Sequence, residues 1–246
     1  MKVISLTAKG FRPYQEDRMK TFQVKQFIVS CIFDGHGGDE VSEFCVKNIE
    51  EICIKNFNIH GVHDIPMLLR NIYKYLDNEI KKLQCIFTGS TATITIITPH
   101  KIFFSNAGDS MAMVASQDKS KTDVIRNMSF EHKVENEISR IKDLGGTIET
   151  NTGMARIGGL NLSRSVGDFH LKKYVISDPF ISSIPRKNVE YIYQASDGIW
   201  DVLSIHEIAD IIKQSNKKEK VLFENIIKKA LEKGSTDNIT STYIEF

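Results

Sequence analysis

The chain has 246 residues, with 32 Lys and Arg against 31 Asp and Glu, so its formal net charge is +1 at pH 7. This balance lacks the basic surface expected of a nucleic-acid-binding domain, and we expect no nucleic-acid partner. Hydrophobic residues make up 41% and charged residues 26% of the sequence, which is typical of a globular chain and argues against a disordered or collagen-like one.

The first half of the chain begins with strand-like segments. Alternating or β-branched residues predict strands over 3–7, 18–24 and 27–33, and the last of these ends at Asp34-Gly35. Apolar residues at helical spacing then predict two helices, with faces running from Val41 to Cys53 and from Leu69 to Leu83. We expect these helices to form an antiparallel pair.

After residue 90, the sequence predicts many strands, a second helix pair and a last strand. Strands are predicted over 91–96, 101–105, 111–116, 189–195 and 239–246, with a short helix over 135–144. A capping box at Ser204 and Glu207 opens a helix to about 214, and another helix runs over 218–233. Because helices come in pairs between runs of strands, we predict an α+β fold with helices packed on antiparallel sheets.

The sequence gives no sign of export or membrane insertion. The apolar run near the N-terminus is shorter than a signal-peptide core, and no stretch of 18 apolar residues occurs. The four cysteines form no Cys-x-x-Cys pair, and a chain of this size needs no disulfide framework. We therefore expect a cytoplasmic protein without a membrane partner, with access to the nucleus left open.

Acidic residues followed by turn-forming residues recur where predicted strands begin or end. They are Asp34-Gly35, Asp197-Gly198, Asp237-Asn238 and the pair Glu16-Asp17. Each alone is explained by the turn-forming tendency of Asp and Gly, but four together favour a shared site. Carboxylates and carbonyls suit Mg²⁺ or Mn²⁺, whereas zinc would require closely spaced His or Cys ligands that the sequence lacks.

These segments belong to seven motifs that occur in the order seen in one known family. The sequence resembles the metal-dependent (PPM, or type 2C) serine/threonine protein phosphatases. The motifs are Arg12-x-x-x-Glu16-Asp17, Phe33-Asp34-Gly35-His36-Gly37-Gly38, Gly89-Ser90-Thr91-Ala92, Asn106-Ala107-Gly108-Asp109-Ser110, Gly159 to Asp168, Ala195 to Asp201, and Asp237-Asn238-Ile239-Thr240. The resemblance implies a four-layer αββα sandwich, two antiparallel sheets flanked by antiparallel helix pairs, within a single catalytic domain over 1–246.

The resemblance also implies roles for individual residues. Asp34, Asp197 and Asp237 would hold two Mg²⁺ or Mn²⁺ ions, with Asp34 bridging and Gly35 contributing its backbone carbonyl. Glu16 and Asp17 would act on the second ion mainly through water. The remaining matched residues are Arg12 for phosphate binding, His36 as the general acid, and Asp109 and Asp168 near a third, weaker metal site that some members have.

The implied reaction is hydrolysis of phosphoserine or phosphothreonine in phosphorylated proteins by a water that bridges the metal ions, without a covalent phosphoenzyme. We expect a monomer. A cysteine-dependent phosphatase is excluded because none of the four cysteines is followed, after five residues, by arginine, and no P-loop is present. The alternative is a catalytically silent phosphate-recognition module on the same fold.

Overall fold

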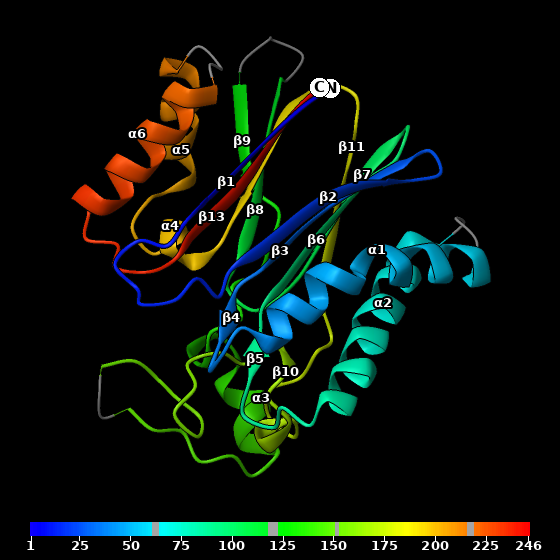
Figure 1. Ribbon diagram of the computed structural model, residues 1–246, viewed down its shortest axis with the longest axis vertical. Coiled ribbons are helices and arrows are strands. Elements are labelled where there is room, and N and C mark those ends of the chain that lie inside the picture. The colour runs from blue at the N-terminus through cyan, green and yellow to red at the C-terminus, as the bar shows by residue number, and fades with distance from the viewer. Residues whose placement is uncertain (61–63, 118–122, 151–152, 216–218) are drawn as a thin grey trace.

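A computed structural model describes residues 1–60, 64–117, 123–150, 153–215 and 219–246 of the chain. The described residues form four layers: two antiparallel sheets packed face to face, with a helix pair on the outer face of each (Figure 1). The predicted four-layer sandwich is therefore confirmed.

The first sheet has the strand order β1-β13-β12-β8-β9. Its strands are β1 (Lys2–Ala8), β8 (Met111–Gln117), β9 (Asp123–Asn127), β12 (Val189–Ala195) and β13 (Ile239–Glu245). The two terminal strands, β1 and β13, pair along their whole length, with Lys2 opposite Glu245.

The second sheet has the order β11-β7-β6-β3-β2, and a small third sheet, β10-β5-β4, lies at one end. Their strands are β2 (Arg18–Val24), β3 (Phe27–Phe33), β4 (Gly35–His36), β5 (Gly89–Ser90), β6 (Ala92–Ile97), β7 (Lys101–Ala107), β10 (Val166–Gly167) and β11 (Phe180–Pro185). The third sheet joins β4 to β5, so the segment that follows β3 is held against the segment that precedes β6.

Each helix pair buries its apolar face on one sheet. The helices are α1 (Glu40–His60), α2 (Ile65–Ile80), α3 (Ile138–Asp143), α4 (Asp197–Trp200), α5 (Ile205–Gln214) and α6 (Glu219–Glu232), with 3₁₀ turns over Lys81–Leu83, Val134–Glu137 and Phe169–Leu171. Residues of α1 and α2 share one core with the second sheet, and residues of α5 and α6 share another with the first. A third core lies between the two sheets, and a small one lies beneath α3.

The interface between the sheets also contains a buried polar bridge. Gln194 on β12 donates from Nε2 to Ser30 Oγ on β3 at 2.8 Å and accepts from Thr95 Oγ1 on β6 at 2.9 Å. All three residues are fully buried. Because a hydrogen bond, unlike an apolar contact, is lost when its partners slide, this bridge fixes how the two sheets align.

Most predicted elements are confirmed. The capping box at Ser204 is present, and Gly145, at φ +79°, follows the short helix that ends at Asp143. Among the described residues, five strands were missed, namely β9, β11 and the two-residue strands β4, β5 and β10. The second helix begins at Ile65, before the predicted apolar face that starts at Leu69. The predicted start of the last helix, at Lys218, lies outside the described residues.

All four cysteines are free, and Cys31, Cys45 and Cys53 are buried in the core beside α1. In the described part of the chain, none of the helices combines the length and apolar character that crossing a bilayer requires.

Candidate metal centre

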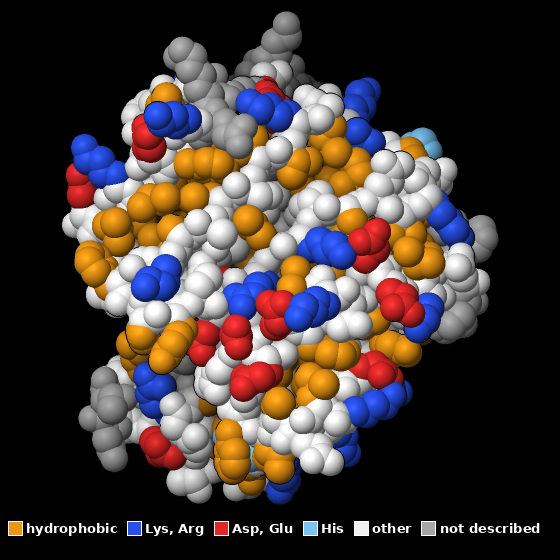
Figure 2. Space-filling model, viewed as in Figure 1, with side chains coloured by type: hydrophobic (Ala, Val, Ile, Leu, Met, Phe, Trp, Pro, Cys, Tyr) orange, Lys and Arg blue, Asp and Glu red, His pale blue; other side chains and the backbone are white. Residues whose placement is uncertain are grey.

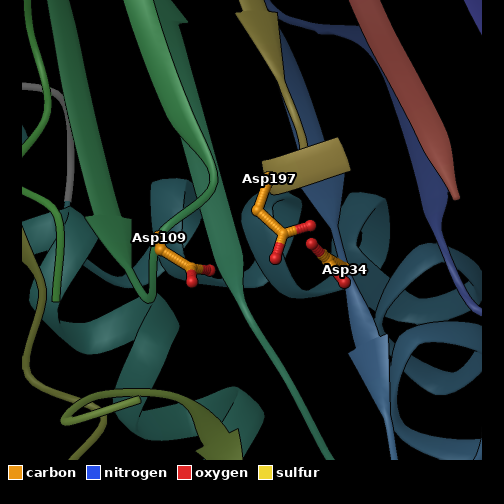
Figure 3. A group of neighbouring side chains, drawn as sticks. All are labelled: Asp34, Asp109 and Asp197. Carbon is orange, nitrogen blue, oxygen red and sulfur yellow. The ribbon is translucent and has the colours of Figure 1, made fainter. Parts of the chain in front are cut away.

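A cleft of about 630 Å³ opens at the end of the sandwich where β3, β7 and β12 terminate. Its lining residues are Arg12, Glu16, Asp34, Gly35, His36, Gly37, Thr91, Asp109, Lys133, Met154, Arg156, Leu160, Asn161, Leu162, Asp197, Asp201 and Asp237. Carboxylate oxygens of Asp34, Asp109 and Asp197 lie within 4.8 Å of one another, and in Figure 3 the side chains of Asp34 and Asp197 point toward each other. The structure thus brings together aspartates from three separate motifs.

Hydroxyl side chains fix the backbone that carries Asp34 and Asp109. The Asp34 N–H donates to Thr91 Oγ1 at 3.1 Å, and Asp34 O accepts from the Thr91 N–H at 2.8 Å. Thr91 Oγ1 also lies 2.8 Å from Ser110 Oγ, next to Asp109. The Gly89-Ser90-Thr91 and Asp109-Ser110 motifs therefore act as a framework that sets the spacing of two acidic residues.

Close packing of two turns positions Asp197 and Asp237. Asp197 opens α4 after β12, and Asp237 precedes β13. A Cβ atom on Gly198 would lie 2.0 Å from the backbone oxygen of Asn238, so only glycine allows these turns to touch. Ser235 Oγ donates to Gly198 O at 2.7 Å and holds the second turn in place.

The loop between β1 and β2 is held to the same turn by one side chain. Asn238 donates from Nδ2 to Lys9 O and Tyr14 O at 2.8 and 2.9 Å, and its Oδ1 accepts from the Glu16 N–H at 2.8 Å. The loop and the turn lie side by side in Figure 1. On this loop, Arg12 forms an ion pair with Asp237 at 2.5 Å. The predicted phosphate-binding arginine therefore lies beside a predicted metal ligand.

The acidic residues raise one another's pKa. Burial, followed by the charge of Asp197, holds the pKa of Asp34 well above its ordinary value. The pKa of Asp197 is likewise held well above its ordinary value by burial and by the charge of Asp109. Burial raises the pKa of Asp109 to about 6, against the opposing charge of Lys133. Positive charge delivered to this cluster would relieve the repulsion.

The other predicted ligands lie around this cluster in different settings. Glu16 and Gly35 line the cleft, whereas Asp17 is buried behind it and accepts from Ser196 Oγ at 2.8 Å. Burial raises the pKa of Asp17 to about 6. A Cβ atom on Gly35 would lie 2.7 Å from Glu16 O, so glycine is needed there for close approach.

His36 and Asp168, predicted for different roles, form a pair. His36 Nε2 lies 2.8 Å from Asp168 Oδ2, which also accepts from Ser165 Oγ. Because an ionised carboxylate only accepts, His36 carries its proton on Nε2 toward Asp168. Although burial opposes it, the hydrogen bond and charge of His36 lower the pKa of Asp168. His36 lines the cleft, and Asp168 supports it from behind.

Lys133 and Asp201 are cleft residues that the sequence analysis missed. Lys133 Nζ lies 2.9 Å from both Asp201 Oδ1 and Glu131 Oε1. Although burial opposes it, these hydrogen bonds raise the pKa of Lys133. Asp201 stands four residues after Asp197, on the next turn of the chain, and this spacing within the motif could have identified it.

The donors in the cleft fit a hard divalent cation. They are carboxylate oxygens gathered at one point, together with the backbone of Gly35, which lines the cleft. Neither cysteine nor a pair of histidines is found among the residues that line the cleft. An oxygen-rich acidic centre beside an arginine suits a metal-dependent enzyme that acts on phosphate esters.

Comparison with known proteins identifies the family. The model of the family Protein phosphatase 2C matches residues 14–239, and the chain belongs to this family of metal-dependent serine/threonine protein phosphatases. Probable protein phosphatase 2C 45 of Oryza sativa subsp. japonica is 30% identical over 224 residues, covering 87% of this chain and 75% of the rice protein. The family and enzyme class predicted from the sequence are thereby confirmed.

Solved structures agree on the fold. A C. elegans sex-determining protein superposes with a TM-score of 0.88 at 25% identity, covering 98% of this chain and 64% of that one. Serine-threonine phosphatase 2C from Toxoplasma gondii superposes with a TM-score of 0.82 at 21% identity, covering 99% of this chain and 94% of that one.

Other curated relatives are longer than this chain. The chain spans 48% and 62% of the length of two of them, both from Arabidopsis thaliana.

Proposed function

We propose that this chain hydrolyses phosphoserine and phosphothreonine in proteins by direct attack of water, without a covalent phosphoenzyme. The observation that carries the proposal is the convergence of Asp34, Asp109 and Asp197 in an open cleft within a chain of this family. The cleft contains no cysteine among its lining residues, so no thiol nucleophile is available there.

The acidic residues would hold two Mg²⁺ or Mn²⁺ ions. Asp34, Asp197 and Asp237 are the proposed ligands, with the Gly35 carbonyl, and with Glu16 and Asp17 acting through water. When bound, the ions would lower the pKa of a water molecule and neutralise charge on the phosphoryl oxygens. A third, weaker site stays a prediction, for which Asp109 is the candidate that lines the cleft.

Arg12 and His36 would handle the substrate's phosphate and leaving group. The guanidinium of Arg12 is half-exposed at the edge of the cleft, where it can hold two phosphate oxygens. His36 would donate a proton to the leaving serine or threonine oxygen. Since its Nε2 is bonded to Asp168, we assign Asp168 to orienting the His36 ring.

The test is phosphate release from a phosphothreonine peptide with Mn²⁺ or Mg²⁺, with and without excess chelator. We expect turnover that depends on either ion, is lost with chelator and is not sustained by Zn²⁺. Full turnover in excess chelator would contradict the metal assignment. No turnover with any ion, despite phosphopeptide binding, would favour the silent recognition module.

A second measurement addresses direct attack. With a ³²P-labelled peptide, a single turnover quenched in acid should release all label as inorganic phosphate and leave none on the protein. Protein-bound label that chases into phosphate would contradict direct attack. The cytoplasmic location and the monomeric state remain proposals, the latter tested by sedimentation.

A further inference from the structure

The most exposed hydrophobic side chains belong to two segments that border the cleft. Among the large hydrophobic side chains of the described residues, the three most exposed are Tyr14 at 75%, Phe11 at 73% and Phe87 at 72%. Phe11 and Tyr14 flank the cleft-lining Arg12, and the Phe87 carbonyl lies against Gly37, which also lines the cleft. A single exposed hydrophobic residue needs no explanation, but the three most exposed ones on segments next to one cleft do.

Met154 adds to this group from another loop. It lines the cleft and is 52% exposed. We call Phe11, Tyr14, Phe87 and Met154 the apolar rim. On the face drawn in Figure 2, acidic and basic side chains are mixed across the middle, and hydrophobic side chains lie above and below them.

Hydrogen bonds hold the backbone of the segments that carry Phe11, Tyr14 and Phe87. Asn238 holds the backbone of Lys9, Tyr14 and Glu16 through three hydrogen bonds. On the other loop, Thr88 O accepts from the Asp168 N–H at 3.0 Å and Ile86 O accepts from the His170 N–H at 3.2 Å. The Phe87 ring contacts the His170 ring, with 4.8 Å between centroids.

The charge of the cleft indicates which substrate residues it favours next to the phosphate. Six of the lining residues are acidic, namely Glu16, Asp34, Asp109, Asp197, Asp201 and Asp237, against three that are basic, namely Arg12, Lys133 and Arg156. Two divalent ions would roughly balance the acids, but they would be occupied by the phosphate. The walls therefore offer little attraction to further acidic side chains, and the rim offers apolar contact.

We infer that the apolar rim selects substrates in which the phosphoserine or phosphothreonine is flanked by large apolar residues. This inference rests on the proposed function. A peptide advances about 3.3 Å per residue when extended, so two residues on each side of the phosphoresidue cover about 13 Å and can reach segments that border the cleft. Apolar residues there bury Phe11, Tyr14 and Phe87 from water, which strengthens binding.

The experiment compares phosphothreonine peptides of one length that differ only in the two residues on each side of the phosphothreonine: glycine, leucine or glutamate. We expect kcat/KM to be about fivefold to tenfold higher for the leucine-flanked peptide than for the glycine-flanked one, mainly through KM, and lowest for glutamate. Metal-dependent hydrolysis of p-nitrophenyl phosphate, which has no flanking residues, reports on the catalytic centre separately.

Variants assign the preference to particular side chains. Phe11→Ala, Tyr14→Ala and Phe87→Ala should each lower the leucine-to-glycine ratio of kcat/KM, and the triple variant should remove most of it. Met67→Ala is the matched control, because Met67 is 53% exposed on α2, outside the cleft, and this variant should keep the ratio. Circular dichroism and thermal melting would show that all variants are folded.

Three results would overturn the inference. One is equal kcat/KM for the leucine- and glycine-flanked peptides in an enzyme that hydrolyses p-nitrophenyl phosphate. Another is a preference that the triple variant retains. The third is self-association that the triple variant abolishes, since the rim would then contact a second copy of the chain. Failure of the proposed function itself would instead appear as no metal-dependent hydrolysis of any substrate.

Discussion

Replacing Asn238 by alanine tests how the loop between β1 and β2 is held to the turn that precedes β13. Asn238 is buried, and its side chain makes three hydrogen bonds, to Lys9 O, Tyr14 O and the Glu16 N–H. At about 1 kcal/mol net for each bond, Asn238→Ala should lower the free energy of unfolding by about 3 kcal/mol. In a chain of this size that corresponds to roughly 10 °C in Tm.

Urea unfolding of the metal-free protein, followed by circular dichroism, measures this loss at constant m-value. The matched control is Asn48→Ala on α1, which removes a single hydrogen bond, from Nδ2 to Phe44 O, and should cost about 1 kcal/mol or less. If Asn238→Ala lowers the free energy of unfolding no more than Asn48→Ala does, the three hydrogen bonds do not hold the loop that carries Phe11 and Tyr14.

Three other changes probe the acidic centre and its surroundings. Asp34→Asn should abolish peptide turnover and metal-induced stabilisation. The metal-free protein should be as stable as wild type or slightly more stable, because a repelling carboxylate is gone. Thermal melts with and without Mn²⁺ check this, and near-normal turnover would rule out Asp34 as the bridging ligand. Arg12→Ala should chiefly raise KM for phosphopeptides, with Arg12→Lys recovering only part, and an unchanged KM in both would remove Arg12 from the site. Asp109 has a pKa of about 6 in the folded protein and near 4 in the unfolded chain, so it contributes stability below pH 4 that is lost as the pH rises through 6. The pKa of buried His132 is lowered to about 4, so its contribution to stability is instead lost as the pH falls. Acidifying the metal-free protein from pH 7 to 5 should therefore stabilise wild type by about 1 kcal/mol more than Asp109→Asn, and parallel pH profiles for the two proteins would contradict the raised pKa.

The sequence predicted the fold where local patterns were strong. Buried runs such as β3 and the capped helix α5 follow directly from periodicity and end signals. Strands β9 and β11 were missed because each lies at the edge of its sheet, and their residues are mostly exposed or half-buried, so they carry a weak apolar signal.

For the candidate site, motifs identified the acidic residues, but only the folded chain shows which of them pair. The His36–Asp168 hydrogen bond joins residues 132 positions apart, and the Arg12–Asp237 ion pair joins residues 225 positions apart. Nothing in the spacing of either pair reveals the contact. Lys133 was missed for the same reason, because its partner Asp201 lies 68 positions further along the chain.

The polar bridge of Gln194, Ser30 and Thr95 has a consequence for how metal ions would bind to the proposed centre and dissociate from it. Asp34 follows a strand of one sheet and Asp197 a strand of the other, so the distance between them depends on how the sheets are aligned. Because buried hydrogen bonds set that alignment within the protein itself, assembling the centre requires no refolding of the chain. Ions bound at the proposed centre would therefore exchange with the surrounding solution through the open cleft, and their occupancy would follow the free metal concentration rather than the history of folding.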